Sequence, residues 1–390
     1  MATERLYYRD SYLIEFEGQV VDVSLGGRRI YLDRTAFYPA SGGQPYDVGE
    51  LGGQAVVEVV DDEDGRIAHV MAGAVALGPV AGKIDWPRRY EHMQQHTGQH
   101  LLSAVLMDLY GFPTLSFHMG QEVSTIELGT KEINERQLLA AEAQANELAR
   151  SGRTVRVEFA DAEQVEGLRK QSQRTGLLRI IEIEGIDKSA CGGTHVGTLA
   201  ETLPLQLRNV EKVRGNVRLE FVCGVRATRR AQRDLKLLRE LSRETAAPLD
   251  ELPGHVAALK ERLSEADKER QRLAGELAQR EGREAYAATA PSPDGLRRVQ
   301  WQVERIHEME RAKALAYAAG ARAVVLVVGK QPAGVLIACS ADSGIDAGAL
   351  LKQTLAEFGG RGGGSPTLAQ GSALDEACTR ALAGKLGLLQ

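Results

Sequence analysis

Two pairs of metal-binding side chains stand far apart in this chain of 390 residues. His96 and His100 are four residues apart in a segment expected to be helical, so both imidazoles project from one face, about one turn apart. Cys191 and His195 form the second pair, in Cys-Gly-Gly-Thr-His, where the glycines allow a tight turn after a strand-like run. Three imidazole nitrogens and one thiolate suit tetrahedral Zn²⁺. The spacing predicts one zinc ion per chain.

Other readings of these residues remain open at this stage. A His-x-x-x-His or Cys-x-x-x-His pair by itself is usually incidental, and His92 lies four residues before His96, so another pair of the three histidines is an alternative. The four cysteines are widely separated in a large chain, which argues against a disulfide framework and in favour of metal binding.

The metal-binding pairs need a helix and a turn to position them. Trp86 and Pro87 predict a helix start, with proline in the first turn, and Gly111 predicts its end. The segment after this helix contains both the residue spacing typical of helices and the short β-branched runs typical of strands. These patterns predict strands at 124–128, 154–160 and 177–185 and helices at 131–151 and 161–171.

The whole chain is predicted to be a multidomain α+β protein. Residues 1–88 contain short β-branched runs between Gly-Gly and Asp-Gly turns, which predict a small antiparallel barrel or sandwich. Residues 89–225 form the α+β domain with the zinc site. Residues 226–290 are rich in Arg, Glu and Leu and repeat apolar residues in steps of three and four, which predicts a helical hairpin or coiled-coil arm. Residues 291–390 predict an α/β domain with strands at 323–329 and 334–340 and a helix at 350–358.

Composition restricts the surroundings of the protein. No apolar run reaches the roughly 20 residues that span a bilayer, and the N-terminus lacks the pattern of a secretory signal. We therefore expect a cytoplasmic protein without a membrane partner. The net charge of −5 argues against indiscriminate nucleic-acid binding. Local basic clusters at 169–174, 212–218 and 226–233 are compatible with a tRNA partner.

Two motifs carry a resemblance to a known family. HTGQHLL (96–102) and SACGGTHVG (189–197) resemble the editing domain of alanyl-tRNA synthetase and its free-standing AlaX-type relatives. DRTAFYPASGGQPYDVGEL (33–51) is similar to the glycine-rich segment before that domain, and GGRGGGSPTLAQG (359–371) resembles the end of the synthetase's DHHA1-type domain. Threonyl-tRNA synthetase has a related domain, but CGGTH favours the alanine branch. The resemblance covers almost the whole chain.

The resemblance implies a trans-editing hydrolase that cleaves the ester of mischarged Ser-tRNA(Ala), with Gly-tRNA(Ala) as a second candidate. The synthetase's aminoacylation region has no counterpart here, so the chain is expected to correct but not to charge. The residues expected in the catalytic pocket are Gln99, Thr114, Ser116, His118 and Gln121. The residues expected to contact tRNA are Thr35, Gly42, Gly43, Gln44 and Arg218. Turn chemistry is the alternative for Thr114 and Ser116 after Pro113, and for the Gly42-Gly43 pair.

Two further expectations concern the C-terminal half and the role of zinc. The GGRGGG segment (359–364) is expected either to cradle phosphate through backbone N–H groups or to be a flexible linkage. By resemblance, the C-terminal region supports a homodimer. Four protein ligands close the coordination shell, as in a structural zinc site. The competing function is therefore a non-catalytic tRNA-binding module. A DHH-type phosphoesterase is disfavoured because its Asp-His-His motif is missing.

Overall fold

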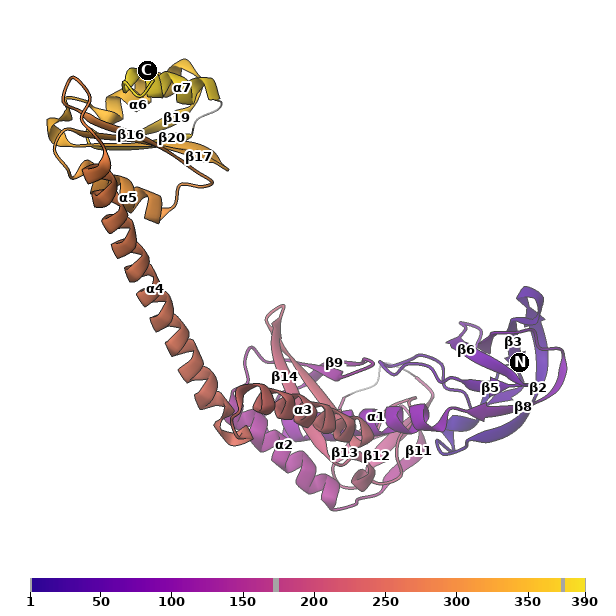
Figure 1. Ribbon diagram of the computed structural model, residues 1–390. Helices are drawn as coiled ribbons and strands as arrows, with labels where there is room; N and C mark the ends of the chain where they lie inside the picture. Colours follow the sequence, from indigo (N-terminus) through magenta and orange to yellow (C-terminus); the bar gives the residue numbers. More distant parts are fainter. Residues whose placement is uncertain (1, 171–174, 373–375, 390) are drawn as a thin grey trace. The chain divides into compact units, whose positions relative to one another are not determined.

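The computed structural model describes residues 2–170, 175–372 and 376–389 (Figure 1). The chain forms two compact units, Met1–Glu240 and Leu241–Gln390. Among the described residues, none of the helices combines the length and the apolar character that crossing a bilayer requires.

The first unit begins with a closed six-stranded barrel in the order β2-β3-β7-β6-β5-β8. The strands are β2 (Glu15–Ser24), β3 (Arg29–Leu32), β5 (Gly49–Leu51), β6 (Gln54–Asp61), β7 (Ile67–Met71) and β8 (Gly78–Ile84), with a separate parallel pair, β1 (Glu4–Arg5) and β4 (Arg34–Thr35). Buried and exposed residues alternate along the first half of β2, as expected when alternate side chains point into a barrel. Of the barrel and the sandwich that the sequence left open, the barrel is confirmed.

Helix α1 (Trp86–Tyr110) carries the first metal-binding pair. The Asp85 side chain caps its start by accepting a hydrogen bond from the Arg88 N–H (3.1 Å), and Pro87 occupies the first turn. The helix stops at Gly111, whose φ of +67° is left-handed. The predicted bounds of this helix are confirmed. Its apolar face packs into the core of the domain through Leu101, Leu102, Val105 and Leu106.

Two antiparallel sheets and a second helix complete the α+β part of the first unit. The sheets have the orders β14-β15-β10-β9 and β11-β12-β13. Their strands are β9 (Thr114–Met119), β10 (Ser124–Leu128), β11 (Val155–Asp161), β12 (Leu177–Ile183), β13 (Asp187–Ala190), β14 (Leu205–Val213) and β15 (Asn216–Cys223). Helix α2 (Glu135–Arg150) begins later than residue 131 because Asn134 forms a capping box with Gln137.

The predicted helix at 161–171 is wrong over residues 161–170. Strand β11 continues through Asp161, and a turn follows. The Asp161 side chain accepts a hydrogen bond from the Glu163 N–H (3.0 Å), and its carbonyl accepts one from the Gln164 N–H (3.0 Å). These local bonds satisfy the backbone in a turn, so Asp161 does not cap a helix. Residue 171 lies outside the described residues.

Two long helices occupy the predicted arm, α3 (Gly224–Thr245) and α4 (Leu252–Ala288). The apolar seam of α4 is exposed within the chain, with exposed fractions of 47% at Val256 and 66% at Leu263. The coiled coil therefore stays a prediction. Near its end α4 packs on helix α5 (Glu308–Ala318), where a side chain at Gly282 would collide with the Lys313 carbonyl oxygen.

The second unit is built on a five-stranded sheet in the order β16-β17-β18-β20-β19. Its further elements are β16 (Arg297–Val303), β17 (Ala323–Lys330), β18 (Ala333–Cys339), β19 (Arg361–Ser365), β20 (Leu368–Ser372), α6 (Ala347–Glu357) and α7 (Glu376–Lys385). Helices α6 and α7 cover one face of the sheet and α5 the other (Figure 1). The predicted strands at 323–329 and 334–340 and the helix at 350–358 are confirmed.

The expectation for the GGRGGG segment is wrong. It is neither a phosphate-cradling loop nor a flexible linkage, because Arg361–Ser365 pairs with Leu368–Ser372 as an antiparallel hairpin at the edge of the sheet. A Cβ at Gly362 would lie 2.6 Å from a methyl carbon of Leu355 in α6. The glycines therefore serve close packing of α6 on the hairpin.

Candidate metal centre

The two distant pairs of metal-binding side chains converge. Helix α1 supplies His96 and His100, and the turn after β13 supplies Cys191 and His195, with one ligand atom of each residue within 4.8 Å of the others. The Cys191 Sγ lies 3.5 Å from His96 Nε2 and 3.4 Å from His195 Nε2. Bond lengths of about 2.0–2.3 Å to a tetrahedral zinc ion require ligand atoms roughly 3.3–3.6 Å apart. The four residues could hold one metal ion.

Each imidazole is oriented by a hydrogen bond on its Nδ1. The partner of His96 is Gln44 Oε1 at 2.8 Å, and the partner of His195 is Thr97 Oγ1 at 3.1 Å. The partner of His100 is Asp187 Oδ2, also at 2.8 Å. When Nδ1 is occupied in this way, Nε2 is left as the metal-binding atom, and the ring is held in place.

The protonation states also fit a metal. Burial alone would raise the pKa of Cys191, but the imidazoles of His96 and His195 lower it well below its usual value, which favours the thiolate. Burial lowers the pKa of His195 to about 3, so that its ring is neutral. Burial opposes the charge on His100, but the hydrogen bonds to Asp187 and Cys191, together with the negative charges of both, outweigh it and raise the pKa to about 9. A metal must therefore displace a proton from His100, which then binds as a strongly basic ligand.

The glycine-rich segment brings Gln44 to the centre. Ser41 and Gln44 close a turn through two backbone hydrogen bonds, and Gly43, with φ of +85°, packs against the backbone of Phe117. Gln44 is buried and also donates to Thr194 Oγ1 at 2.8 Å. Gln44 therefore joins the barrel side of the unit to the Cys-Gly-Gly-Thr-His turn.

A buried ion pair fixes the same segment to α1. The Arg89 guanidinium is fully buried and donates from Nε to the Asp47 carboxylate (3.0 Å) and from Nη1 to the Ser11 carbonyl (3.0 Å). Asp47 in turn accepts from the Tyr38 N–H at 2.7 Å. Removing one partner of such a pair leaves a buried charge without compensation, so the pair holds α1 against the loop that carries Gln44.

A pocket of roughly 680 Å³ opens beside the four ligands. His96, His100 and Cys191 line it, so the centre faces the pocket. Gln99 and Thr114 also line it and meet at a hidden hydroxyl: Ser103 Oγ accepts from Gln99 Nε2 (2.8 Å) and from Thr114 Oγ1 (2.7 Å). Ser116 and Gly42 complete the set of predicted residues found along the pocket.

Other predicted residues lie elsewhere. Thr35 on β4 is fully buried, and its Oγ1 lies 2.8 Å from Nε2 of His69 on the barrel strand β7. His118 and Gln121 are exposed and are not among the described residues that line the pocket. Side chains alternate along a strand, so His118 points away from the face of Phe117, whose ring lies 5.3 Å from that of His96.

Arg218 and His92 also lie apart from the centre. Arg218 on β15 stands between Glu127 on β10 and Glu211 on β14. His92 is buried in α1, and burial lowers its pKa to about 3, but it is not part of the metal-binding group among the described residues.

Sequence reasoning missed the residues that support the ligands. Asp187 and Thr97 carry no local signal for this role, because their partners come from other elements. Ser103, which supports Gln99 and Thr114, was also missed. Arg179 donates from Nη1 to the carbonyls of Cys191 (2.7 Å) and Gly193 (2.8 Å) and so holds the ligand turn. The only hint in the sequence is an arginine inside the apolar run LLRIIEI.

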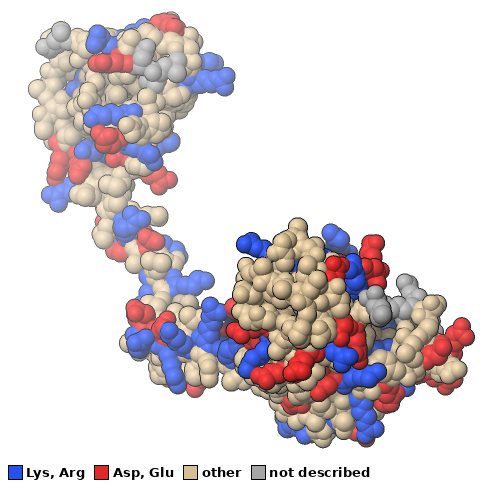
Figure 2. All heavy atoms as spheres, turned by 90° about the vertical axis from the view of Figure 1, so that its right-hand side faces the viewer, with Lys and Arg blue, Asp and Glu red and all other residues tan. Residues whose placement is uncertain are grey.

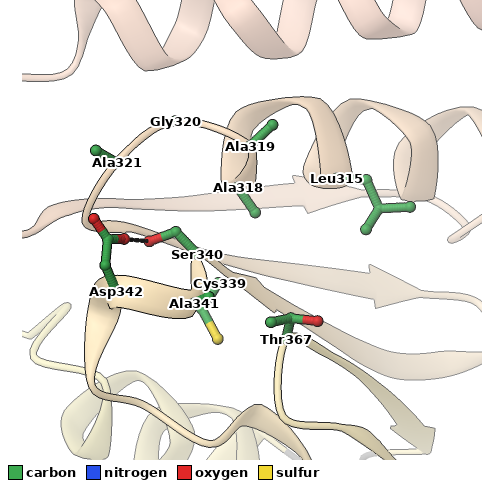
Figure 3. A pocket seen from close by; sticks show the side chains of 10 residues that line it. All are labelled: Leu315, Ala318, Ala319, Gly320, Ala321, Cys339, Ser340, Ala341, Asp342 and Thr367. Atoms are coloured by element: carbon green, nitrogen blue, oxygen red, sulfur yellow. Dashed lines mark hydrogen bonds between the residues drawn. The ribbon is translucent and has the colours of Figure 1, made fainter.

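A second cavity of roughly 520 Å³ lies in the C-terminal unit (Figure 3). Small side chains at the end of α5 and of β18 line it, and its carboxylate, Asp342, already accepts hydrogen bonds from the Ser340 hydroxyl (2.6 Å) and the Arg322 N–H (2.8 Å). Its polar groups are satisfied within the protein, so we assign it no ligand. On the face of the molecule seen in Figure 2, basic and acidic side chains are interspersed.

Comparisons with known proteins identify relatives with the same arrangement of sequence. The chain is 31% identical over 392 residues to the alanyl-tRNA editing protein AlaX-L of Pyrococcus horikoshii, which covers 94% of each chain. It is 33% identical over 255 residues to the alanyl-tRNA editing protein Aarsd1 of Danio rerio, or 60% of this chain and 62% of that one. It is 32% identical over 392 residues to the alanine–tRNA ligase of Korarchaeum cryptofilum, but spans only 43% of it. No family model matches the chain.

These matches place the chain among proteins related in sequence to alanyl-tRNA editing proteins and to alanine–tRNA ligases. The near-complete mutual coverage with AlaX-L makes the assignment specific: the chain belongs to the family of alanyl-tRNA editing proteins. The resemblance inferred from the sequence motifs is confirmed.

Proposed function

We propose that this protein is a trans-editing hydrolase that removes serine, and also glycine, from mischarged tRNA(Ala) without charging tRNA itself. The observation that carries the proposal is the centre: three imidazoles turned by outer hydrogen bonds toward one thiolate, at the wall of a pocket that also contains Gln99 and Thr114. The names of the relatives add the substrate class, alanyl-tRNA.

In the proposed reaction, water attacks the ester carbonyl carbon, the bond from that carbon to the ribose oxygen breaks, and the ribose hydroxyl regains a proton. Zn²⁺ is the proposed ion, one per chain, and when bound it supplies a Lewis acid beside the ester. Gln99 and Thr114 bind and orient the aminoacyl group, held by Ser103 behind them. Thr114 provides a hydroxyl for a seryl side chain, and this hydrogen bond favours serine over alanine, which cannot make it. Glycine also lacks the hydroxyl, so its removal does not depend on this contact.

A competing proposal is a tRNA-binding module with a structural zinc, which the set of four protein ligands favours. Against it, three of the four ligands line the pocket, so the ion would be accessible to a substrate. The partner in both proposals is tRNA(Ala), the expected location is the cytoplasm, and we propose a homodimer through the C-terminal region. The exposed apolar residues of α4 support that last point, and light scattering tests it.

The test is deacylation of Ser-, Gly- and Ala-tRNA(Ala) by the purified protein, with and without chelator. We expect hydrolysis of the first two, little of the third, and loss of activity when the metal is removed. Cys191→Ala should abolish hydrolysis while the circular dichroism spectrum stays unchanged. Inertness toward all three substrates would remove the enzymatic proposal, and loss of folding together with activity would favour the structural zinc.

A further inference from the structure

A basic residue at the pocket is joined to the metal centre by a buried carboxylate. Arg169 donates from Nε to Asp187 Oδ1 at 2.6 Å, and Asp187 Oδ2 accepts from His100 Nδ1 at 2.8 Å. Ser189 closes the cluster: its hydroxyl donates to Asp187 Oδ2 (2.9 Å) and accepts from Arg169 Nη2 (3.2 Å). Two hydrogen bonds and one carboxylate therefore join Arg169 to the ring of the metal ligand His100.

The position of Arg169 is set by the fold. Its backbone N–H donates to the Lys188 carbonyl at 2.9 Å, which fixes residue 169 against β13. The Asp187 side chain has no exposed surface, whereas the Arg169 side chain is 17% exposed. A fully buried carboxylate needs a cation in contact, and once His100 is neutral and bound to a metal, Arg169 is the cation that compensates Asp187. Arg169 thus keeps Asp187 charged and correctly placed, and Asp187 keeps the His100 ring aimed at the metal.

The outer side of the same residue faces the pocket. Arg169 and Lys170 are both lining residues, and Lys170 is exposed. A third lining cation, Arg5, is already neutralised by a two-fold hydrogen bond with Asp61 (2.8 and 2.7 Å). The volume of roughly 680 Å³ suits a drug-sized ligand, larger than one aminoacyl group, and the exposed ring of Phe159 also lines the pocket. Basic side chains beside an exposed aromatic ring suit the phosphate and base of a single-stranded nucleotide.

We propose that Arg169 has two roles: it positions the metal ligand His100 through Asp187, and with Lys170 it binds a backbone phosphate at the 3′ end of the RNA. The second role rests on the proposed function, whereas the first does not. Arg169 is a positioning residue toward the metal, because it touches the ligand only through Asp187.

Adjacent residues allow the two roles to be separated. Arg169→Ala removes both the contact with Asp187 and a charge of the pocket, whereas Lys170→Ala removes only a charge. Arg169→Lys keeps the charge but loses the fork that spans Asp187 and Ser189. The metal arm measures Zn²⁺ affinity by competition with a chromogenic chelator, without RNA. The RNA arm uses an acceptor-stem hairpin that has a single-stranded 3′ end and carries no amino acid. Its Kd is measured over a range of salt concentrations, with the blunt hairpin as control.

In the metal arm, we expect Arg169→Ala to lower Zn²⁺ affinity by about 10- to 100-fold, as is typical for partners of metal ligands. Lys170→Ala should leave the Zn²⁺ affinity unchanged, and Arg169→Lys should lower it less than Arg169→Ala does. Zn²⁺ affinity of Arg169→Ala within two-fold of the wild type would overturn the positioning role. Should Arg169→Ala fail to fold, as judged by circular dichroism, Arg169→Lys decides in its place.

In the RNA arm, both alanine variants should weaken binding of the single-stranded end and reduce the salt slope of log K by about 0.7 each, the value for one phosphate contact on a single strand. Arg169→Lys should bind RNA like the wild type. An unchanged salt slope in Arg169→Ala, or equal binding of the blunt hairpin, would overturn the phosphate contact. The RNA carries no amino acid, and the metal arm contains no RNA. A failure of the proposed deacylation therefore does not affect the outcome of either arm.

Discussion

Replacing Gly193 by alanine would place a methyl group against the ring of His96. The new Cβ would collide with Cε1 and Nδ1 of His96 and would lie 3.1 Å from Gln44 Oε1, the atom that orients this ring. The backbone of Gly193 is itself fixed, because its carbonyl accepts from Arg179 Nη1 at 2.8 Å. The imidazole therefore has to move.

The size of the effect follows from the geometry. Ordinary contact between non-bonded heavy atoms is about 3.5 Å, so the ring must shift by roughly 1 Å. Metal–ligand distances tolerate only about 0.2 Å. The shift removes His96 as a ligand and also breaks its bond to Gln44. Loss of an outer partner alone costs about 10- to 100-fold in metal affinity, so we expect at least about 100-fold here, or ~2.7 kcal/mol.

The neighbouring glycine provides the control. A Cβ at Gly192 would meet only Tyr8, with its hydroxyl oxygen at 3.4 Å, an ordinary contact. Gly192→Ala should therefore bind Zn²⁺ within about three-fold of the wild type, a difference of ~0.7 kcal/mol. Competition with a chromogenic chelator measures both variants, and thermal melts confirm that both fold. Equal Zn²⁺ affinity of Gly193→Ala and the wild type would refute the assignment of His96 as a ligand.

Three further predictions concern stability. Gly98→Ala in α1 should destabilise the protein by about 1–3 kcal/mol, because its Cβ would lie 2.6 Å from Cys223 Sγ. Gly275→Ala in α4, with open space around it, should stabilise the protein by about 0.5–1 kcal/mol. Denaturant melts measure both variants, and a stabilised Gly98→Ala would contradict the packing. Chelation should lower the melting temperature of the unit Met1–Glu240 and leave that of Leu241–Gln390 unchanged, since only the first contains the centre. Zn²⁺ at 100 times its Kd should restore about 2.7 kcal/mol of the free energy of unfolding of the first unit. Calorimetry that shows equal shifts in both transitions would argue against this. Burial lowers the pKa of His69 to about 4, so between pH 6.5 and about 4 the unfolded chain binds a proton that the folded barrel excludes. In this range the free energy of unfolding should fall by up to about 1.4 kcal/mol per pH unit of acidification. His69→Gln should flatten this slope in melts at several pH values, and an unchanged slope would exclude His69 as its source.

Local signals account for what was predicted correctly. Pro87 and Gly111 bound α1 through a preset φ and a left-handed C-cap, each of which depends on neighbours in sequence. The same kind of signal failed at Asp161, which can cap a helix or close a turn. There the continuing ladder of β11 with β12 decided for the turn.

Strand faces were harder to predict than strands. The segment 114–119 shares register with β10 only up to a bulge at Glu127 and Leu128, and that register decides which side chains face α1. Phe117 therefore faces His96, and His118 faces outward, although both stand in the same motif. Likewise, no local pattern in the glycine-rich segment predicts that Thr35 is buried. Its burial follows from the packing of β4 against His69 of β7.

The sequence by itself determined the ligand types, the one-turn spacing of His96 and His100, and the glycine-bent turn of Cys191 and His195, because each of these is encoded within a few residues. Only the tertiary structure decided that both pairs meet, and that Gln44, Thr97 and Asp187 turn the three rings. The physical reason is that a hydrogen bond between residues 52, 98 or 87 positions apart in the chain leaves no periodicity in either segment, and exists only once the barrel, α1 and β13 have packed together.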